Sequence, residues 1–142
     1  MYVQRMRGPE RDSATVEPDW ETIASAILRL DNHDFYYIAL DTGRQDPTMT
    51  IGGGKSVWCP PGYWNARYLV NCTDAEGNWY MLSDPRIATH YPDEAEVTLC
   101  LGGQTSGFDA DTCVYRETVL QATETFAVRG ESDTRLRWIK NP

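Results

Sequence analysis

Ile51-Gly52-Gly53-Gly54 is the stretch of this sequence that constrains the fold most. Three consecutive glycines permit positive φ, a β-bulge or a close approach of two backbones. Because Lys55 and Ser56 follow, the run is similar to the end of a phosphate-binding loop. That motif also requires a glycine where Met49 stands and a helix after the serine, whereas the flanking residues here are typical of strands. We therefore interpret the glycines as a feature of the sheet backbone and do not expect nucleotide binding.

Predicted strands lie on both sides of the glycine run. Apolar, aromatic and β-branched residues fill 35–40, as in a strand covered on both faces. The loop at 73–77 joins two further segments into a predicted hairpin. The predicted strands are 35–40, 48–51, 56–59, 66–72, 78–83, 97–101 and 136–138. The polar, glycine-containing stretch 102–111 is interpreted as a loop.

Two segments show the periodicity of amphipathic helices. The first covers 20–30, where apolar residues recur three and four positions apart, and Asp19 stands in the N-cap position. The second covers about 116–129 and ends at Gly130, which stands in the C′ position. Both helices are therefore expected to pack one apolar face against the sheet.

The charged segment 1–16 lacks any periodicity, so we expect it to form a flexible arm. The remaining residues, 17–142, are enough for one domain with a continuous core. The sequence therefore predicts an α+β fold. Its expected form is a single antiparallel sheet of about five or six strands, with an N-terminal and a C-terminal helix packed on it.

Several short sequence motifs occur along the chain in an order that resembles one protein family. They are the helix that opens with Asp19-Trp20 and closes on Leu30-Asp31-Asn32, the Ile51-Gly52-Gly53-Gly54 run, Ala122 with Phe126 and Gly130, and Leu136-Arg137-Trp138. Together they resemble the bacterial Immunity protein 1 family, whose members neutralise the toxic domains of polymorphic toxins. The resemblance implies an α+β inhibitor of a cognate toxin domain, often a nuclease or a deaminase. These anchors are structural, and they do not identify the toxin.

The charge of the chain is negative and unevenly distributed. Asp and Glu outnumber Lys and Arg by 21 to 13, which gives a net charge of −8. Between Asp74 and Glu117, nine acidic residues face only Arg86 and Arg116, a net charge of −7. This balance argues against direct nucleic-acid binding, which needs a basic surface. It suits a docking surface for a basic partner, or alternatively a solvated surface that keeps the protein soluble.

An acidic inhibitor is able to occupy the basic cleft of a nucleic-acid-directed toxin, where its carboxylates take the place of phosphates. We expect the carboxylates of the middle third to supply this charge and two loop aromatics to supply apolar anchoring. The predicted toxin-binding residues are Tyr63, Trp64, Asp74, Glu76, Asp93, Glu94, Glu96, Asp109 and Asp111.

Two other classes of function stay open. A non-catalytic ligand- or carbohydrate-binding module would use the loop aromatics Tyr63 and Trp64 for stacking. A small hydrolase would need carboxylates that converge in a pocket. Neither His33 nor His90 is accompanied by a recognisable nucleophile motif, so we predict that the protein is not an enzyme.

We expect neither a cofactor nor a metal site. Cys59, Cys72, Cys100 and Cys113 form no Cys-x-x-Cys pair and are interpreted as buried thiols. No apolar run reaches the length of a membrane span, and the basic N-terminus is not followed by an apolar stretch as in a signal peptide. The predictions are a cytoplasmic location, no membrane partner and, by preference, a monomer.

Overall fold

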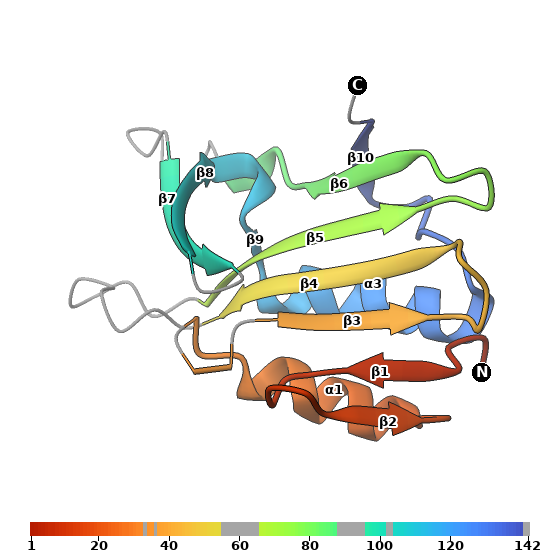
Figure 1. Cartoon of the computed structure of the whole chain (residues 1–142). Helices are drawn as coiled ribbons and strands as arrows, with labels where there is room; N and C mark the ends of the chain where they lie inside the picture. Colours follow the sequence, from red (N-terminus) through yellow and green to blue (C-terminus); the bar gives the residue numbers. More distant parts are fainter. Residues whose placement is uncertain (33, 36, 55–65, 88–95, 102–103, 141–142) are drawn as a thin grey trace.

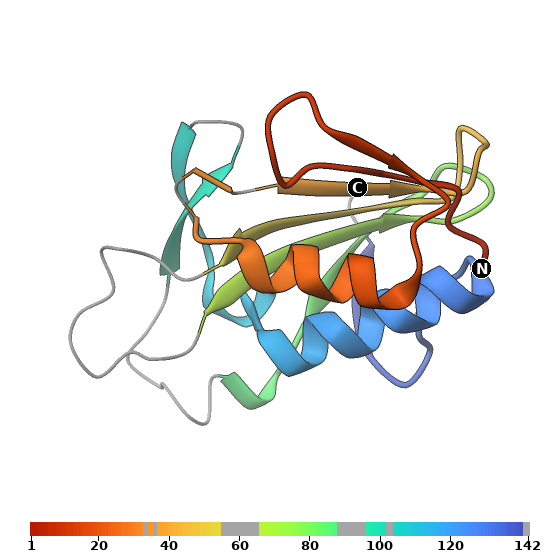
Figure 2. The ribbon, with the colours of Figure 1, turned by 90° about the horizontal axis from the view of Figure 1, so that it is seen from below.

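The computed structural model describes residues 1–142 except 33, 36, 55–65, 88–95, 102–103 and 141–142. In the described part, a large antiparallel sheet carries two helices on one face and a two-stranded hairpin on the other (Figure 1, Figure 2). The predicted α+β class is therefore confirmed. The predicted size of the sheet is wrong, because eight described strands form the large sheet and two more form a second one.

The large sheet has the strand order β10-β6-β5-β4-β3-β1-β2, and β9 pairs with β5 beside this path. Its strands are β1 (Arg5–Arg7), β2 (Ala14–Val16), β3 (Tyr37–Asp41), β4 (Thr48–Gly54), β5 (Arg67–Thr73), β6 (Trp79–Ser83), β9 (Val114–Tyr115) and β10 (Arg137–Lys140). The second sheet consists of β7 (Glu96–Leu101) and β8 (Gln104–Asp109). All of these pairs are antiparallel.

Both predicted helices are confirmed together with their caps. In α1 (Trp20–Arg29), the Asp19 side chain accepts a hydrogen bond of 2.8 Å from the Thr22 N–H, as an N-cap does. In α3 (Arg116–Arg129), Gly130 adopts the left-handed conformation and donates its N–H to the Phe126 carbonyl at 2.8 Å. Figure 2 shows the two helices side by side beneath the sheet.

The main core lies between these helices and the sheet. Alternate residues of the central strands face the helices, because successive side chains of a strand point to opposite faces. Ile51 of β4 and Val70 of β5 are opposite each other in the register and fully buried, and Ile27 and Phe126 cover them from the helices. Burial of this apolar surface is the main stabilising contribution to the domain.

The glycine run lies where α1 passes close to β4. A Cβ atom on Gly54 would overlap the Leu30 carbonyl at the end of α1, and one on Gly53 would overlap the Arg67 carbonyl of β5. Gly53 and Gly54 have φ of 101° and 117°, values that L side chains rarely adopt. The interpretation of the run as a backbone feature of the sheet is therefore confirmed. Lys55 and Ser56 lie outside the described residues.

The flexible arm expected at 1–16 is wrong. β1 pairs with both β2 and β3, so the segment extends the sheet by two strands. Val3 and Met6 are buried in the main core, and the Tyr2 N–H donates to the Ala127 carbonyl of α3 at 2.8 Å. The sequence shows no clear period here because each strand has only three residues.

The loop expected at 102–111 is also wrong for most of its length. β8 pairs with β7 along the whole strand, and a 3-10 helix, η1 (Ala110–Thr112), follows it. Leu99 and Phe108 of this hairpin pack on Leu69 of β5, on the sheet face opposite the helices. Because β8 contributes few apolar side chains to that contact, its sequence gives little sign of a strand. The strand expected at 56–59 lies outside the described residues.

Candidate functional site

The structure separates the predicted toxin-binding residues into two groups. Tyr63, Trp64, Asp93 and Glu94 lie outside the described residues. Glu96, Asp109 and Asp111 belong to the β7–β8 hairpin and the η1 turn that follows it; we call these three the hairpin acids. Asp74 and Glu76 lie in the β5–β6 loop, at the opposite end of the sheet (Figure 1, Figure 2). The described carboxylates of the acidic middle third therefore do not form one continuous surface.

The hairpin acids are exposed on the outer side of an amphipathic hairpin. Glu96 and Asp109 are directly opposite each other in the register, so their side chains leave the same face. Asp111 follows two residues later and is also exposed. Among the described residues, no ion pair joins these three carboxylates to a lysine or an arginine. Like charges opposite each other in a sheet destabilise it, so this pair is unfavourable for folding alone.

Asp74, in contrast, stabilises the loop in which it lies. Its carboxylate accepts hydrogen bonds of 3.0 Å from the backbone N–H groups of Glu76 and Asn78, and a third from the Asn78 side-chain amide. The Asn78 side chain, followed by these N–H groups, lowers the pKa of Asp74. Such an Asx-type arrangement is a local device for shaping a turn. We therefore assign Asp74 a structural role, and Glu76 lies beside it on the exposed loop.

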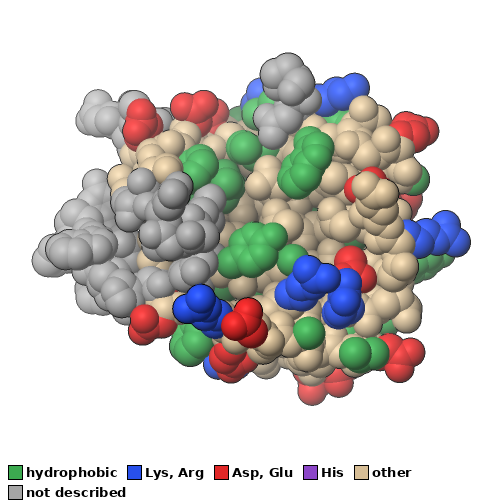
Figure 3. All heavy atoms as spheres, viewed as in Figure 1, with side chains coloured by type: hydrophobic (Ala, Val, Ile, Leu, Met, Phe, Trp, Pro, Cys, Tyr) green, Lys and Arg blue, Asp and Glu red, His purple; other side chains and the backbone are tan. Residues whose placement is uncertain are grey.

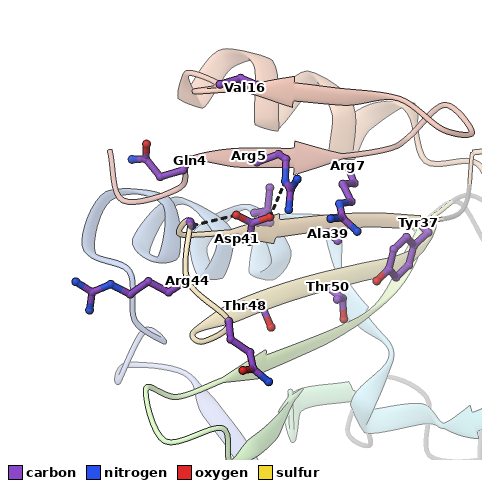
Figure 4. Close-up of a pocket in the computed structure, with 13 residues that line it drawn as sticks. Gln4, Arg5, Arg7, Val16, Tyr37, Ala39, Asp41, Arg44, Thr48 and Thr50 are labelled. Carbon is purple, nitrogen blue, oxygen red and sulfur yellow. Dashed lines mark hydrogen bonds and ion pairs between the residues drawn. The ribbon is translucent and has the colours of Figure 1, made fainter.

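A second surface with functional potential lies on the open face of the large sheet, and sequence reasoning missed it. Between β2 and β4 this face is hollowed into a trough of about 690 Å³. Small side chains of β3 and β4 form its floor: Ala39, Thr48 and Thr50. Figure 4 shows arginine side chains from β1 and from the β3–β4 turn at its rim, and Tyr37 at one end. Figure 3, which views this face, shows Lys and Arg side chains together over the strands near β1.

The rim of the trough is basic although the chain as a whole is acidic. Arg5 pairs with Asp41 through an Nε to Oδ2 distance of 3.0 Å, and Asp41 also accepts from the Gly43 N–H. Arg7 and Arg44 are exposed and form no ion pair with a described residue. Three arginines against one aspartate leave a local charge of +2. The alternation Arg5-Met6-Arg7 is the sequence pattern that could have predicted this surface. In a strand it places both arginines on one face and the buried Met6 on the other.

Several other polar side chains are buried, but they hold loops in place. Arg67 is 7% exposed, donates from Nη2 to the Ala110 carbonyl at 2.8 Å and lies over the Tyr115 ring. Asp133 is 3% exposed and accepts hydrogen bonds from Arg135, Thr125 and Gln121. The Arg67 contacts connect η1 to the sheet, and the Asp133 contacts connect the α3–β10 loop to α3.

Metal-ligand side chains and free thiols were the remaining candidates for a chemical site. Within the described part of the chain, no group of three or more His, Cys, Asp or Glu is arranged to hold a metal ion. Cys72 and Cys113 are buried free thiols, as predicted, and burial followed by the charge of Asp74 raises the pKa of Cys72 to about 12. His33, His90 and Cys59 lie outside the described residues. No described helix is long and apolar enough to cross a membrane.

Comparisons of the chain with protein families, with curated proteins and with solved structures find no match. Its function must therefore be inferred from the residues and their geometry.

Proposed function

We propose that this chain is an immunity protein, a non-catalytic inhibitor that binds and neutralises a bacterial toxin domain through the hairpin acids. The observation that carries the proposal is the pairing of Glu96 directly opposite Asp109 on an exposed hairpin face, with Asp111 beside it and no described basic partner. A hairpin selected for stability alone would avoid like charges at opposed positions. A basic protein partner would turn the same arrangement into an attractive one.

The proposed target is a toxin domain that acts on nucleic acid. Such a domain needs a basic cleft to hold phosphates, and a set of carboxylates on a projecting hairpin is able to enter that cleft in their place. The net charge of −8 adds a long-range attraction that accelerates encounter. The resemblance of the sequence to the Immunity protein 1 family supports the same type of partner. This proposal leaves Asp74 out of the contact and keeps Glu96, Asp109 and Asp111 from the predicted residues.

The direct test uses the toxin domain encoded immediately upstream of this chain, since immunity proteins are normally encoded beside their toxins. Co-expression with a tag on the toxin domain should recover the chain in a stable complex, and the purified chain should abolish toxin activity at a stoichiometric ratio. Failure to bind the neighbouring domain would contradict the proposed function.

A second experiment tests the contact itself. The variant Glu96→Gln/Asp109→Asn/Asp111→Asn should slow association at low salt by about tenfold and flatten its salt dependence, because steering charges act mainly on the association rate. The matched control is Asp12→Asn/Glu124→Gln/Glu131→Gln, which removes the same charge from exposed positions elsewhere. Equal effects of the two variants would assign the attraction to net charge and remove the hairpin acids from the interface.

A further inference from the structure

The open face of the large sheet carries a second surface whose charge is opposite to that of the hairpin acids. The β7–β8 hairpin covers the part of this face that belongs to β5, and among the described residues no element covers the part between β2 and β4. We propose that this trough binds an extended, carboxylate-rich segment of a protein partner, with Arg7 and Arg44 as the principal contacts. The inference does not depend on the proposed toxin-binding function, because it rests on different strands and on the opposite charge.

Charge complementarity selects the chemistry of the occupant. Arg5, Arg7 and Arg44 surround the trough with Asp41 as the one acidic residue of its lining, so the local charge is +2 in a chain of −8. A guanidinium group presents a planar fork of N–H donors that matches a carboxylate in a bidentate arrangement. The two arginines without a described ion-pair partner, Arg7 and Arg44, are therefore the ones available for such contacts.

The spacing of the arginines fits an extended segment. Arg5 and Arg7 leave the same face of β1 two residues apart, which corresponds to a rise of roughly 6.6 Å along the strand. Alternate side chains of an extended peptide repeat at the same interval, so a carboxylate bound at Arg7 would place the next one near Arg5, which already pairs with Asp41. The floor follows β3 from Tyr37 to Asp41, roughly 13 Å at the rise of a strand, which accommodates about four or five extended residues.

The floor and the end of the trough support the same occupant. Thr50 is opposite the small side chain of Ala39, and Thr48 is opposite Asp41, where its hydroxyl also lies 3.2 Å from the Thr73 hydroxyl. A backbone laid along β3 therefore finds hydroxyl groups beside it without a steric barrier. Tyr37 is 42% exposed at one end of the floor and offers an aromatic surface to a neighbouring side chain. Figure 4 shows Arg7 beside Tyr37, and the Arg7 charge opposes the rise that partial burial causes in the pKa of Tyr37.

Two other classes of ligand fit less well. A small molecule is normally enclosed over most of its surface, whereas this trough is open to solvent along its length (Figure 4). A nucleic-acid strand carries a charge at every phosphate, and the chain opposes it with a net charge of −8. A short peptide with two or three carboxylates meets the local positive charge with less repulsion from the rest of the protein.

The test measures the fluorescence anisotropy of a fluorescein-labelled hexaglutamate peptide titrated with the full chain at low salt, with hexaglutamine as the uncharged reference. Hexaglutamate should bind and hexaglutamine should not.

The variant Arg7→Glu/Arg44→Glu should weaken hexaglutamate binding by about tenfold or more. The matched control Arg129→Glu/Lys140→Glu changes the charge equally at exposed positions without a described ion-pair partner and should change binding less than twofold. Asp41→Asn, which removes the single negative charge of the trough, should tighten binding about twofold to threefold.

A second measurement keeps the inference testable if a variant folds poorly. Amide chemical shifts of the unmodified chain should change with hexaglutamate mainly in β1, β3 and the β3–β4 turn. Shift changes elsewhere, equal binding by the two double variants, or no binding of hexaglutamate would each overturn the inference. Tighter binding of a hexathymidine oligonucleotide, lost in Arg7→Glu/Arg44→Glu, would overturn it in favour of a phosphate-bearing ligand.

Discussion

The two faces of the large sheet are formed by alternate residues of the same strands, but they differ in burial and in the type of side chain. On the helix-covered face, Ile38 and Ile51 oppose each other in β3 and β4 and are fully buried under α1 and α3. On the open face, the neighbouring pair is Ala39 opposite Thr50, and arginines and an exposed tyrosine stand around it. The covered face holds the main core, and the part of the open face between β2 and β4 holds exposed polar and charged groups.

The largest effect is expected from a comparison of two aromatic residues on opposite faces of the sheet. Phe126→Ala removes a fully buried side chain from the core and should lower the free energy of unfolding by about 3–5 kcal/mol. Tyr37→Ala, on the open face, should lower it by less than about 1 kcal/mol, as is usual for surface positions. Urea unfolding followed by tryptophan fluorescence measures both. Similar losses for the two variants would show that the open face contributes to the core.

The glycine run provides the second test. Gly54→Ala places a Cβ against the Leu30 backbone at a φ of 117° and should destabilise the fold by about 2–4 kcal/mol. Gly107→Ala, in β8, meets only the flexible end of the Glu96 side chain at an ordinary φ. Its effect should stay within about 0.5 kcal/mol. The same denaturation experiment applies, and a tolerated Gly54→Ala would contradict the close contact between α1 and β4.

These two tests concern the part of the fold that the sequence predicts well. The helices have long periodic patterns and explicit caps, such as Asp19 and Gly130, so their limits are predictable from local rules. β1, β2 and β9 are too short to show a period, and β8 becomes a strand only because β7 lies beside it. Tertiary pairing, which no local pattern records, decides those elements.

The third test compares a buried carboxylate with an exposed one. The buried one is Asp133, in the loop between α3 and β10. Arg135 above all holds the pKa of Asp133 well below its ordinary value, and the carboxylate is 3% exposed. Because the folded pKa is lowered, the stabilisation is complete above the unfolded pKa of about 4 and disappears as the pH falls toward the folded value. Asp133→Asn should therefore lower the free energy of unfolding at pH 7 by about 2–3 kcal/mol.

The difference between Asp133→Asn and the unmodified chain should shrink as the pH is lowered from about 5 toward 2. The control is Asp12→Asn, whose side chain is 94% exposed, and it should leave the stability at pH 7 unchanged. Chemical denaturation at a series of pH values measures both variants. A difference that stays constant with pH would mean that the charge of Asp133 does not contribute.

The candidate site was harder to predict than the fold, for a related reason. The acidic excess between residues 74 and 117 is visible in the sequence, but its members have different roles in the structure. Asp74 shapes a turn and Asp84 is buried beside Arg86, whereas Glu96 and Asp109 become neighbours only through the register of β7 with β8. The basic trough was missed because its arginines come from β1 and from the β3–β4 turn, within an acidic chain.

The smallest expected effect is a gain in stability, and it tests whether the hairpin acids serve binding or folding. Glu96→Gln removes one of two like charges that face each other across the β7–β8 pair, so it should stabilise the protein by about 0.2–1 kcal/mol at low salt. Glu124→Gln, on the exposed surface of α3, is the control and should produce no comparable gain. Thermal unfolding at low and high salt measures both variants, and screening by salt should reduce the gain in stability.

A gain in stability together with slower toxin association would mean that Glu96 contributes to binding although it destabilises the fold. A loss of stability would instead give Glu96 a structural role and remove the argument that its charge serves binding.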